Sequence, residues 1–102
     1  MNIVYYRNKS DGKIRWCHEV PESKIPKDKL LEKIEEYNSN SDKDTAEVFS
    51  PEPNSFEAYI WNLSQEKASL RVETLNDLLH DLSSAECLVI ELLNQMERGE
   101  QT

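Results

Sequence analysis

Side chains able to do chemistry are few in this sequence, and those present are poorly placed to act together. Cys17 directly precedes His18, but adjacent residues of a strand point to opposite faces, so neither can activate the other. His80 and Cys87 are seven residues apart on one predicted helix, about 10.5 Å by helical rise, which is too far for one tetrahedral metal ion. Only two glycines are present, which nearly excludes a glycine-rich phosphate loop. We therefore predict no catalytic residue, no metal site, no cofactor and no enzymatic activity.

Acidic residues near the C-terminus give the stronger signal. The net charge is −8, and residues 73–100 carry seven acids against one base. Four of these acids lie outside the apolar arc of the helix predicted there, within about 80° of one another around the axis and over about 27 Å of helix. They are Glu73, Asp77, Asp81 and Glu91. Such a row matches a row of lysines and arginines, so these four are the primary candidate site for a protein partner with a basic surface. The plainer alternative is a solvated helix face.

A second candidate site combines bases with aromatic residues near the N-terminus. It comprises Tyr5, Arg7, Arg15 and Trp16. Residues 1–18 carry four bases against one acid, and aromatics beside bases are typical of platforms on which single-stranded nucleic acid stacks. The net charge of −8 argues against direct nucleic-acid binding, because the rest of the chain would repel phosphates. The alternative is that the rings form the core and the bases line an exposed edge.

A β-hairpin is predicted to position this second site. Residues 2–8 and 13–20 are rich in β-branched and aromatic side chains, and they flank Asp11-Gly12, a strong signal for a two-residue turn. On the register that such a turn sets, one face carries Ile3, Tyr5, Arg7, Trp16, His18 and Val20, and the other carries Val4, Tyr6, Arg15 and Cys17. A change of one residue in the turn would move one strand's set to the opposite face.

The middle of the chain is predicted to hold a helix and two further strands. Helix 27–38 is predicted from apolar residues at helical spacing, namely Leu30, Leu31, Ile34 and Tyr37. Residues 45–50 are predicted to be a strand. Residues 55–62 alternate as a strand does, but they also fit a helix capped at Asn54. Their aromatic and β-branched content favours the strand.

Residues 71–98 are predicted to be helical, with apolar residues over an arc of about 160°. Ser83-Ser-Ala-Glu86 is a good capping box, so the segment is either one helix or two helices joined at Ser83. The order is then ββαββα, an α+β fold in which a small antiparallel sheet is covered on one face by helices, with a long C-terminal helix or helical hairpin. The arc exceeds the roughly 100° that packing on one sheet face requires, which favours a homodimer.

Length and composition indicate one small domain. The 102 residues fit a single domain, 1–102, in which residues 99–102 are expected to form a disordered tail. No stretch approaches the roughly 18 apolar residues that span a bilayer, so no membrane partner is expected. Cys17 and Cys87 are expected to be thiols in a reducing compartment, which indicates the cytoplasm.

Five short runs stand out for a likeness to known proteins. They are Ile3-Val-Tyr-Tyr-Arg7, Gly12-Lys-Ile, Glu35-Glu-Tyr-Asn38, Thr45-Ala-Glu-Val48 and Phe56-Glu-Ala-Tyr59. In these runs the chain resembles small uncharacterised proteins of bacterial phages and mobile elements. Small acidic proteins of that setting include anti-CRISPR inhibitors of nucleases, to which this chain is similar in size, charge and absence of active-site motifs.

The resemblance implies a non-catalytic inhibitor in the cytoplasm of a bacterial host cell. Such a protein would present carboxylates to the basic channel of a nucleic-acid-handling protein, for example a Cas nuclease. Two alternatives remain open. One is a phage adaptor or structural protein that oligomerises through its C-terminal helix, and the other is a weak binder of single-stranded nucleic acid that uses the N-terminal hairpin.

Overall fold

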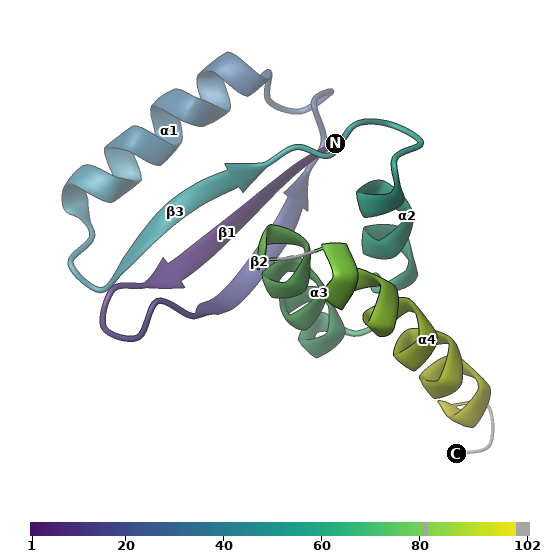
Figure 1. Cartoon of the computed structure of the whole chain (residues 1–102). Coiled ribbons are helices and arrows are strands. Elements are labelled where there is room, and N and C mark those ends of the chain that lie inside the picture. Colours follow the sequence, from purple (N-terminus) through teal and green to yellow (C-terminus); the bar gives the residue numbers. More distant parts are fainter. Residues whose placement is uncertain (81, 100–102) are drawn as a thin grey trace. The chain divides into compact units, whose positions relative to one another are not determined.

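The computed structural model describes residues 1–80 and 82–99. Its elements are β1 (Asn2–Asn8), β2 (Ile14–Val20), α1 (Lys27–Asn40), β3 (Asp44–Phe49), α2 (Phe56–Leu63), α3 (Ala68–His80) and α4 (Leu82–Gly99) (Figure 1). The α+β class, the antiparallel sheet and the C-terminal helices are confirmed. The chain divides into two compact units, Met1–Pro53 and Asn54–Thr102, which we call the N-terminal unit and the helical unit. The single domain 1–102 stays a prediction, and residues 100–102 of the predicted tail lie outside the described residues.

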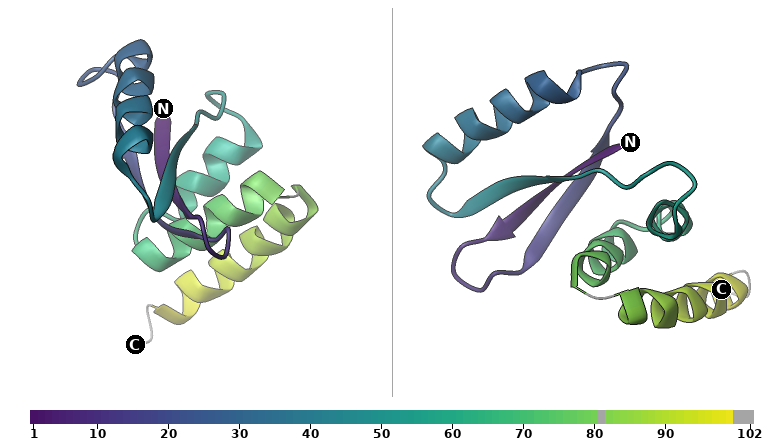
Figure 2. Two further views of the ribbon diagram at one scale, coloured as in Figure 1. Left: turned by 90° about the vertical axis from the view of Figure 1, so that its left-hand side faces the viewer. Right: turned by 45° about the horizontal axis from the view of Figure 1, so that its top comes forward.

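The N-terminal unit is a three-stranded antiparallel sheet with α1 along one face (Figure 2). The strand order is β2-β1-β3, so β1 is central and the other two strands are edges. Strand pairing gives the α1 face the residues Val4, Tyr6, Trp16, His18, Ala46 and Val48. Tyr37 of α1 lies edge-on against Tyr6 on this face. The buried apolar residues on this side of the unit are Val4, Leu30 and Ala46.

The turn of the hairpin is longer than predicted. Gly12 N donates a hydrogen bond to Asn8 O at 2.8 Å, and Asn8 N donates to Lys13 O at 2.9 Å, so four residues, Lys9–Gly12, make the turn. Gly12 has a φ of +71°, which only glycine adopts readily. A type I′ turn requires a positive φ at both central positions, and Asp11 does not have one. The prediction of a two-residue turn was therefore wrong.

A β-bulge next to the turn shifts the register of the hairpin by one residue relative to the prediction. Arg7 pairs with Ile14, but the next pair is Tyr6 with Trp16, so β2 has one extra residue, Arg15, between these pairs. Tyr6 pairs with Trp16 and Tyr5 pairs with Cys17. Trp16 therefore lies on the face of Tyr6, and the predicted face that joined Trp16 to Tyr5 and Arg7 was wrong. The physical reason is the alternation of side chains along a strand, by which a slip of one residue exchanges the two faces.

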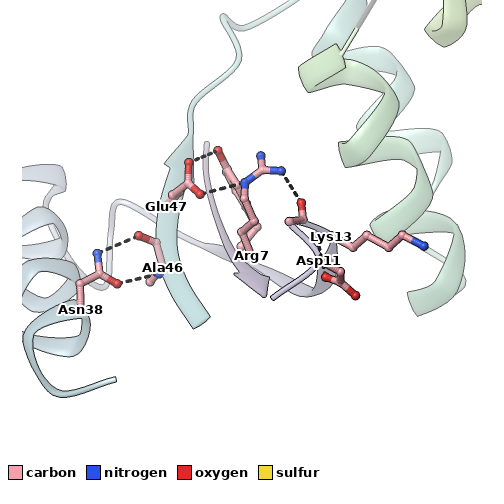
Figure 3. Close-up of polar contacts among 8 residues, drawn as sticks. Arg7, Asp11, Lys13, Asn38, Ala46 and Glu47 are labelled. Carbon is pink, nitrogen blue, oxygen red and sulfur yellow. Dashed lines mark hydrogen bonds and ion pairs between the residues drawn. The ribbon is translucent and has the colours of Figure 1, made fainter. Parts of the chain in front are cut away.

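The side chain of Asn38 ties the end of α1 to the edge strand β3 (Figure 3). Asn38 Nδ2 donates to Ala46 O at 3.1 Å, and Ala46 N donates to Asn38 Oδ1 at 2.7 Å. An edge strand presents unpaired N–H and C=O groups along its outer side. The single amide satisfies one group of each kind, much as a neighbouring strand would. The predicted helix 27–38 and strand 45–50 are confirmed, with bounds that differ by one or two residues.

Residues 56–63 form the helix α2, so the strand favoured for 55–62 was wrong. Ser55 caps this helix, because its Oγ accepts a hydrogen bond from Ala58 N at 3.2 Å. Asn54 precedes the cap and has a φ of 65°. The adjacent residues Ile60 and Trp61 both have no exposed surface, whereas a half-buried strand would point one of them to solvent. Capping and burial thus override the β propensity of the segment.

The segment predicted as helical over 71–98 consists of two helices, as the capping box at Ser83 allowed. α3 ends at His80 and α4 begins at Leu82, just before the predicted junction, and the two helices pack against each other and against α2. The large buried apolar side chains of the helical unit are Ile60, Trp61, Leu75, Leu78, Leu88 and Leu92. Among the described residues, no helix is long and apolar enough to cross a membrane.

We predict that Asn38→Leu lowers the free energy of unfolding by about 1–3 kcal/mol, because the partly buried N–H and C=O of Ala46 lose both partners. The matched control is Asn40→Ala, since the exposed Asn40 amide donates only to Glu36 O within the same helix. The control should change stability by less than about 0.5 kcal/mol. Urea unfolding measures both, and equal midpoints for the two variants would contradict the structural role of Asn38.

Candidate functional site

The predicted acidic site is divided between two helices. Glu73 and Asp77 lie one turn apart on α3, and Glu91 lies on α4. The fourth predicted residue, Asp81, lies outside the described residues. The prediction that these acids form a row of about 27 Å along one helix axis was wrong, because α3 ends at His80 and α4 packs against α3. We name Glu73, Asp77 and Glu91 the acidic face.

The acidic face holds two carboxylates close enough to repel each other. Partial burial raises the pKa of Asp77, and the negative charge of Glu91 raises it further, while His80 acts in the opposite direction. Glu73 and Glu91 are exposed. The ion pairs found among the described residues are Arg7–Glu47 and Arg15–Asp11, and both lie in the N-terminal unit. The acidic face therefore presents negative charge that no described ion pair neutralises.

Arg7, a residue of the second candidate site, is engaged within the N-terminal unit. Its Nε lies 3.1 Å from Glu47 Oε2, and its Nη1 donates to Gly12 O at 2.8 Å (Figure 3). Its guanidinium lies 5.8 Å from the ring centroid of Tyr5, whose hydroxyl donates to Glu47 Oε1 at 3.2 Å. Burial and the charge of Glu47 raise the pKa of Tyr5. Arg7 thus joins β1, the turn and β3, so it would have to leave these partners to bind a phosphate.

Trp16 lies on the opposite face of the sheet, in an aromatic cluster. The rings of Tyr6 and Trp16 are stacked with centroids 5.0 Å apart and an interplanar angle of 18°. The ring centroid of His18 lies 4.8 Å from that of Trp16. Partial burial lowers the pKa of His18. Tyr37 completes the cluster from α1, with its centroid 5.3 Å from that of Tyr6.

The second candidate site is therefore two separate places. Arg15 and Trp16 line one hollow, whereas Tyr5 and Arg7 belong to the other face of the sheet. The hollow also includes residues outside the four of the second candidate site, namely Tyr6, a further aromatic residue of the predicted hairpin, and Asn8, Tyr37 and Asp44. The signal that would have found the place of Tyr6 is the β-bulge at Arg15, because the register shift between Arg7–Ile14 and the next pair puts Tyr6 opposite Trp16.

The thiols and histidines do not gather into a metal centre in the described part of the chain. Groups of three or more His, Cys, Asp or Glu side chains able to hold a metal ion are absent among the described residues. Cys17 is buried in β2 and Cys87 is exposed on α4, and neither forms a disulfide.

Comparisons with protein-family models, with curated proteins and with solved structures found no match to this chain. What is known of its function therefore comes from the charges and contacts of its own residues.

We predict that Asp77→Asn stabilises the protein at neutral pH by on the order of 0.5 kcal/mol, in a setting that solvent partly screens. The substitution removes the cost of partly burying a charge and, in smaller part, the repulsion from Glu91. The raised pKa means that the folded state holds the Asp77 proton more tightly than the unfolded chain. The contribution of Asp77 to the free energy of unfolding is therefore favourable at low pH. It is lost as the pH rises from 3.8, the ordinary pKa of an aspartate, through the higher pKa of Asp77 in the folded state.

Urea unfolding at neutral pH and at a pH below 3.8 tests this prediction, with Glu66→Gln in the exposed turn between α2 and α3 as the control. The Asn variant should gain stability only at neutral pH, and the control should change little at either pH. A loss of stability in Asp77→Asn at neutral pH would show that the carboxylate makes a favourable contact instead.

Proposed function

We propose that this chain is a non-catalytic inhibitor from a phage or mobile element, which acts in the cytoplasm of a bacterial host cell. It binds a basic surface on a nucleic-acid-handling protein, with a Cas nuclease as the partner of this kind to test first. The binding residues are those of the acidic face, together with Asp81 as the fourth predicted member.

The observation that carries this proposal is the concentration of uncompensated negative charge in one unit. Residues 54–102 carry nine acids against three bases, a net charge of −6, whereas residues 1–53 carry eleven acids against nine bases, a net charge of −2. Within the helical unit, partial burial and the nearby negative charge of Glu91 raise the pKa of Asp77. A lysine or arginine from a partner would relieve this repulsion. A positive charge is therefore bound more favourably here than on a surface where acids and bases are evenly mixed.

Neutralising the acidic face should cut partner affinity by about tenfold or more and flatten its salt dependence, because charge pairs across an interface strengthen and steer binding. The variant is Glu73→Gln, Asp77→Asn and Glu91→Gln combined. The measurement is inhibition of DNA cleavage by a panel of purified Cas nucleases, together with a pull-down from bacterial lysate and mass spectrometry of the recovered partner.

The matched control removes the same number of charges from another exposed helix face, α1, with Glu32→Gln, Glu35→Gln and Glu36→Gln. The control should keep both the partner and the salt dependence. A second control reverses the charges of Lys9 and Arg15 on the hairpin. Loss of binding in the hairpin variant with binding retained in the acidic-face variant would reject the acidic face as the site.

Self-association through α4 is a second candidate function, which would suit a phage adaptor or structural protein. It is favoured by large apolar side chains that α4 leaves exposed at intervals of three residues: Ile90 is 63% exposed, Leu93 is 46% exposed and Met96 is 44% exposed. Apolar side chains at this spacing on one helix are the usual anchors of helix–helix contact.

If α4 is a self-association surface, light scattering at micromolar concentration should give the mass of a dimer, and Ile90→Glu with Leu93→Glu should return the monomer. Leu31→Glu on α1, where the wild-type side chain is 44% exposed, is the matched control and should not change the mass. Salt separates the two functions, since apolar contact persists at high ionic strength while charge-steered binding weakens. A monomer mass for the unaltered chain would reject self-association.

A further inference from the structure

The hollow beside Trp16, which we name the Trp16 hollow, lies within the N-terminal unit on the α1 face of the sheet. Its volume is about 220 Å³, and its lining residues are Tyr6, Asn8, Arg15, Trp16, Tyr37 and Asp44. All three strands and α1 contribute to it. Sites for drug-sized ligands measure about 300–1,000 Å³, so this hollow suits one fused ring system, with any attached groups of the ligand lying at its rim.

Trp16 gives the hollow a surface on which a planar ring can stack. The residue lies on the edge strand β2 and is 56% exposed, even though Tyr6 stacks on it at 5.0 Å. Indole surface therefore remains for a second ring. Stacking of a nucleobase on an aromatic side chain is favourable for every base, since every base has a π-face.

Asp44 gives the hollow a fixed acceptor. Its Oδ1 accepts hydrogen bonds from the Tyr37 hydroxyl at 2.6 Å and from Ser41 Oγ at 2.8 Å. These bonds hold the pKa of Asp44 below its usual value, so the group is a carboxylate at neutral pH. A carboxylate accepts about four hydrogen bonds, so Asp44 retains acceptor capacity for an amino group of a ligand.

Arg15 gives the hollow a cation at its rim. Its side chain is 64% exposed and pairs with Asp11. Exposed ion pairs of this kind contribute little to stability, so Arg15 can exchange Asp11 for a phosphate at small cost, and a guanidinium matches phosphate geometry well.

We propose that the Trp16 hollow binds an amino-bearing purine nucleoside monophosphate. The base stacks on Trp16, its amino group donates to Asp44 and the phosphate pairs with Arg15. A single nucleotide fits better than a strand, because strand binding requires a continuous positive groove. Here the cations near the hollow alternate with carboxylates, as Lys9 and Lys43 line the adjoining hollow together with Asp42. This site is independent of the acidic face.

Tryptophan fluorescence of the full chain tests the proposal with GMP as the probe. The chain has two tryptophans, and Trp61 is fully buried in the helical unit while Trp16 is exposed, so quenching by a stacked base reports on Trp16. GMP should quench the emission saturably, and Trp16→Phe should abolish that change. IMP, which differs from GMP only in lacking the 2-amino group, should bind about tenfold more weakly because the hydrogen bond to a charged acceptor is lost.

Two variants assign the contacts within the hollow by calorimetric titration. Asp44→Asn should lose the preference for GMP over IMP, and Arg15→Gln should weaken GMP binding while leaving binding of guanosine, which has no phosphate, unchanged. Tyr59→Ala on the exposed side of α2 is the control and should bind GMP as the unaltered chain does. Circular dichroism shows whether each variant is folded.

Three results would overturn the proposal. The first is the absence of quenching by millimolar GMP, and the second is equal affinity for GMP and IMP in the unaltered chain. The third is saturation by a single-stranded oligonucleotide at a concentration more than about tenfold below that of GMP, with a steep salt dependence, which would assign the hollow to a strand instead.

Discussion

The two hydrogen bonds between the Asn38 amide and the backbone of Ala46 are the constraint on which the α1 side of the sheet depends. They hold the last turn of α1 against the outer edge of β3, and this sets the positions of the residues on either side. Tyr37 precedes Asn38, so its ring reaches Tyr6 and its hydroxyl reaches Asp44. The wall of the Trp16 hollow is thus a consequence of how one edge strand satisfies its backbone. The other edge strand, β2, carries the exposed Trp16.

The sequence allowed the hairpin to be predicted but not its register, and the reason lies in the turn and in the β-bulge next to it. Asp11-Gly12 signals a reversal of the chain, yet Gly12 supplies a positive φ equally well at the end of a four-residue turn. Propensity does not distinguish these turns, because the difference lies in whether Gly12 N reaches Asn8 O. The β-bulge at Arg15 then exchanges the faces of the residues of β2 that follow it, and the consequence for the site is large. Arg7 and Trp16, grouped as one candidate surface, point to opposite faces.

The helical unit shows a similar division between what propensity determines and what packing determines. The spacing of apolar residues predicts that residues 71–98 are helical, and the helices α3 and α4 agree with that prediction. The strand favoured for residues 55–62 failed because β propensity describes how a side chain fits a pleated surface, and Phe56–Leu63 instead buries Ile60 and Trp61 from a capped helix. The proximity of Asp77 and Glu91 was equally hidden, since it arises only when α4 packs against α3.

If the acidic face binds a basic partner as proposed, that proximity couples folding of the helical unit to binding. The ionised pair of Asp77 and Glu91 lowers the stability of the folded state, and the unfolded chain does not hold the two carboxylates together. A cation that contacts this pair only in the folded state stabilises the unit by mass action. Dissolved salt screens the same repulsion but also weakens attraction to a basic partner. A rise in ionic strength should therefore stabilise the free protein while it weakens the complex, and these opposite responses distinguish a binding face from an acidic surface that serves only to keep the protein in solution.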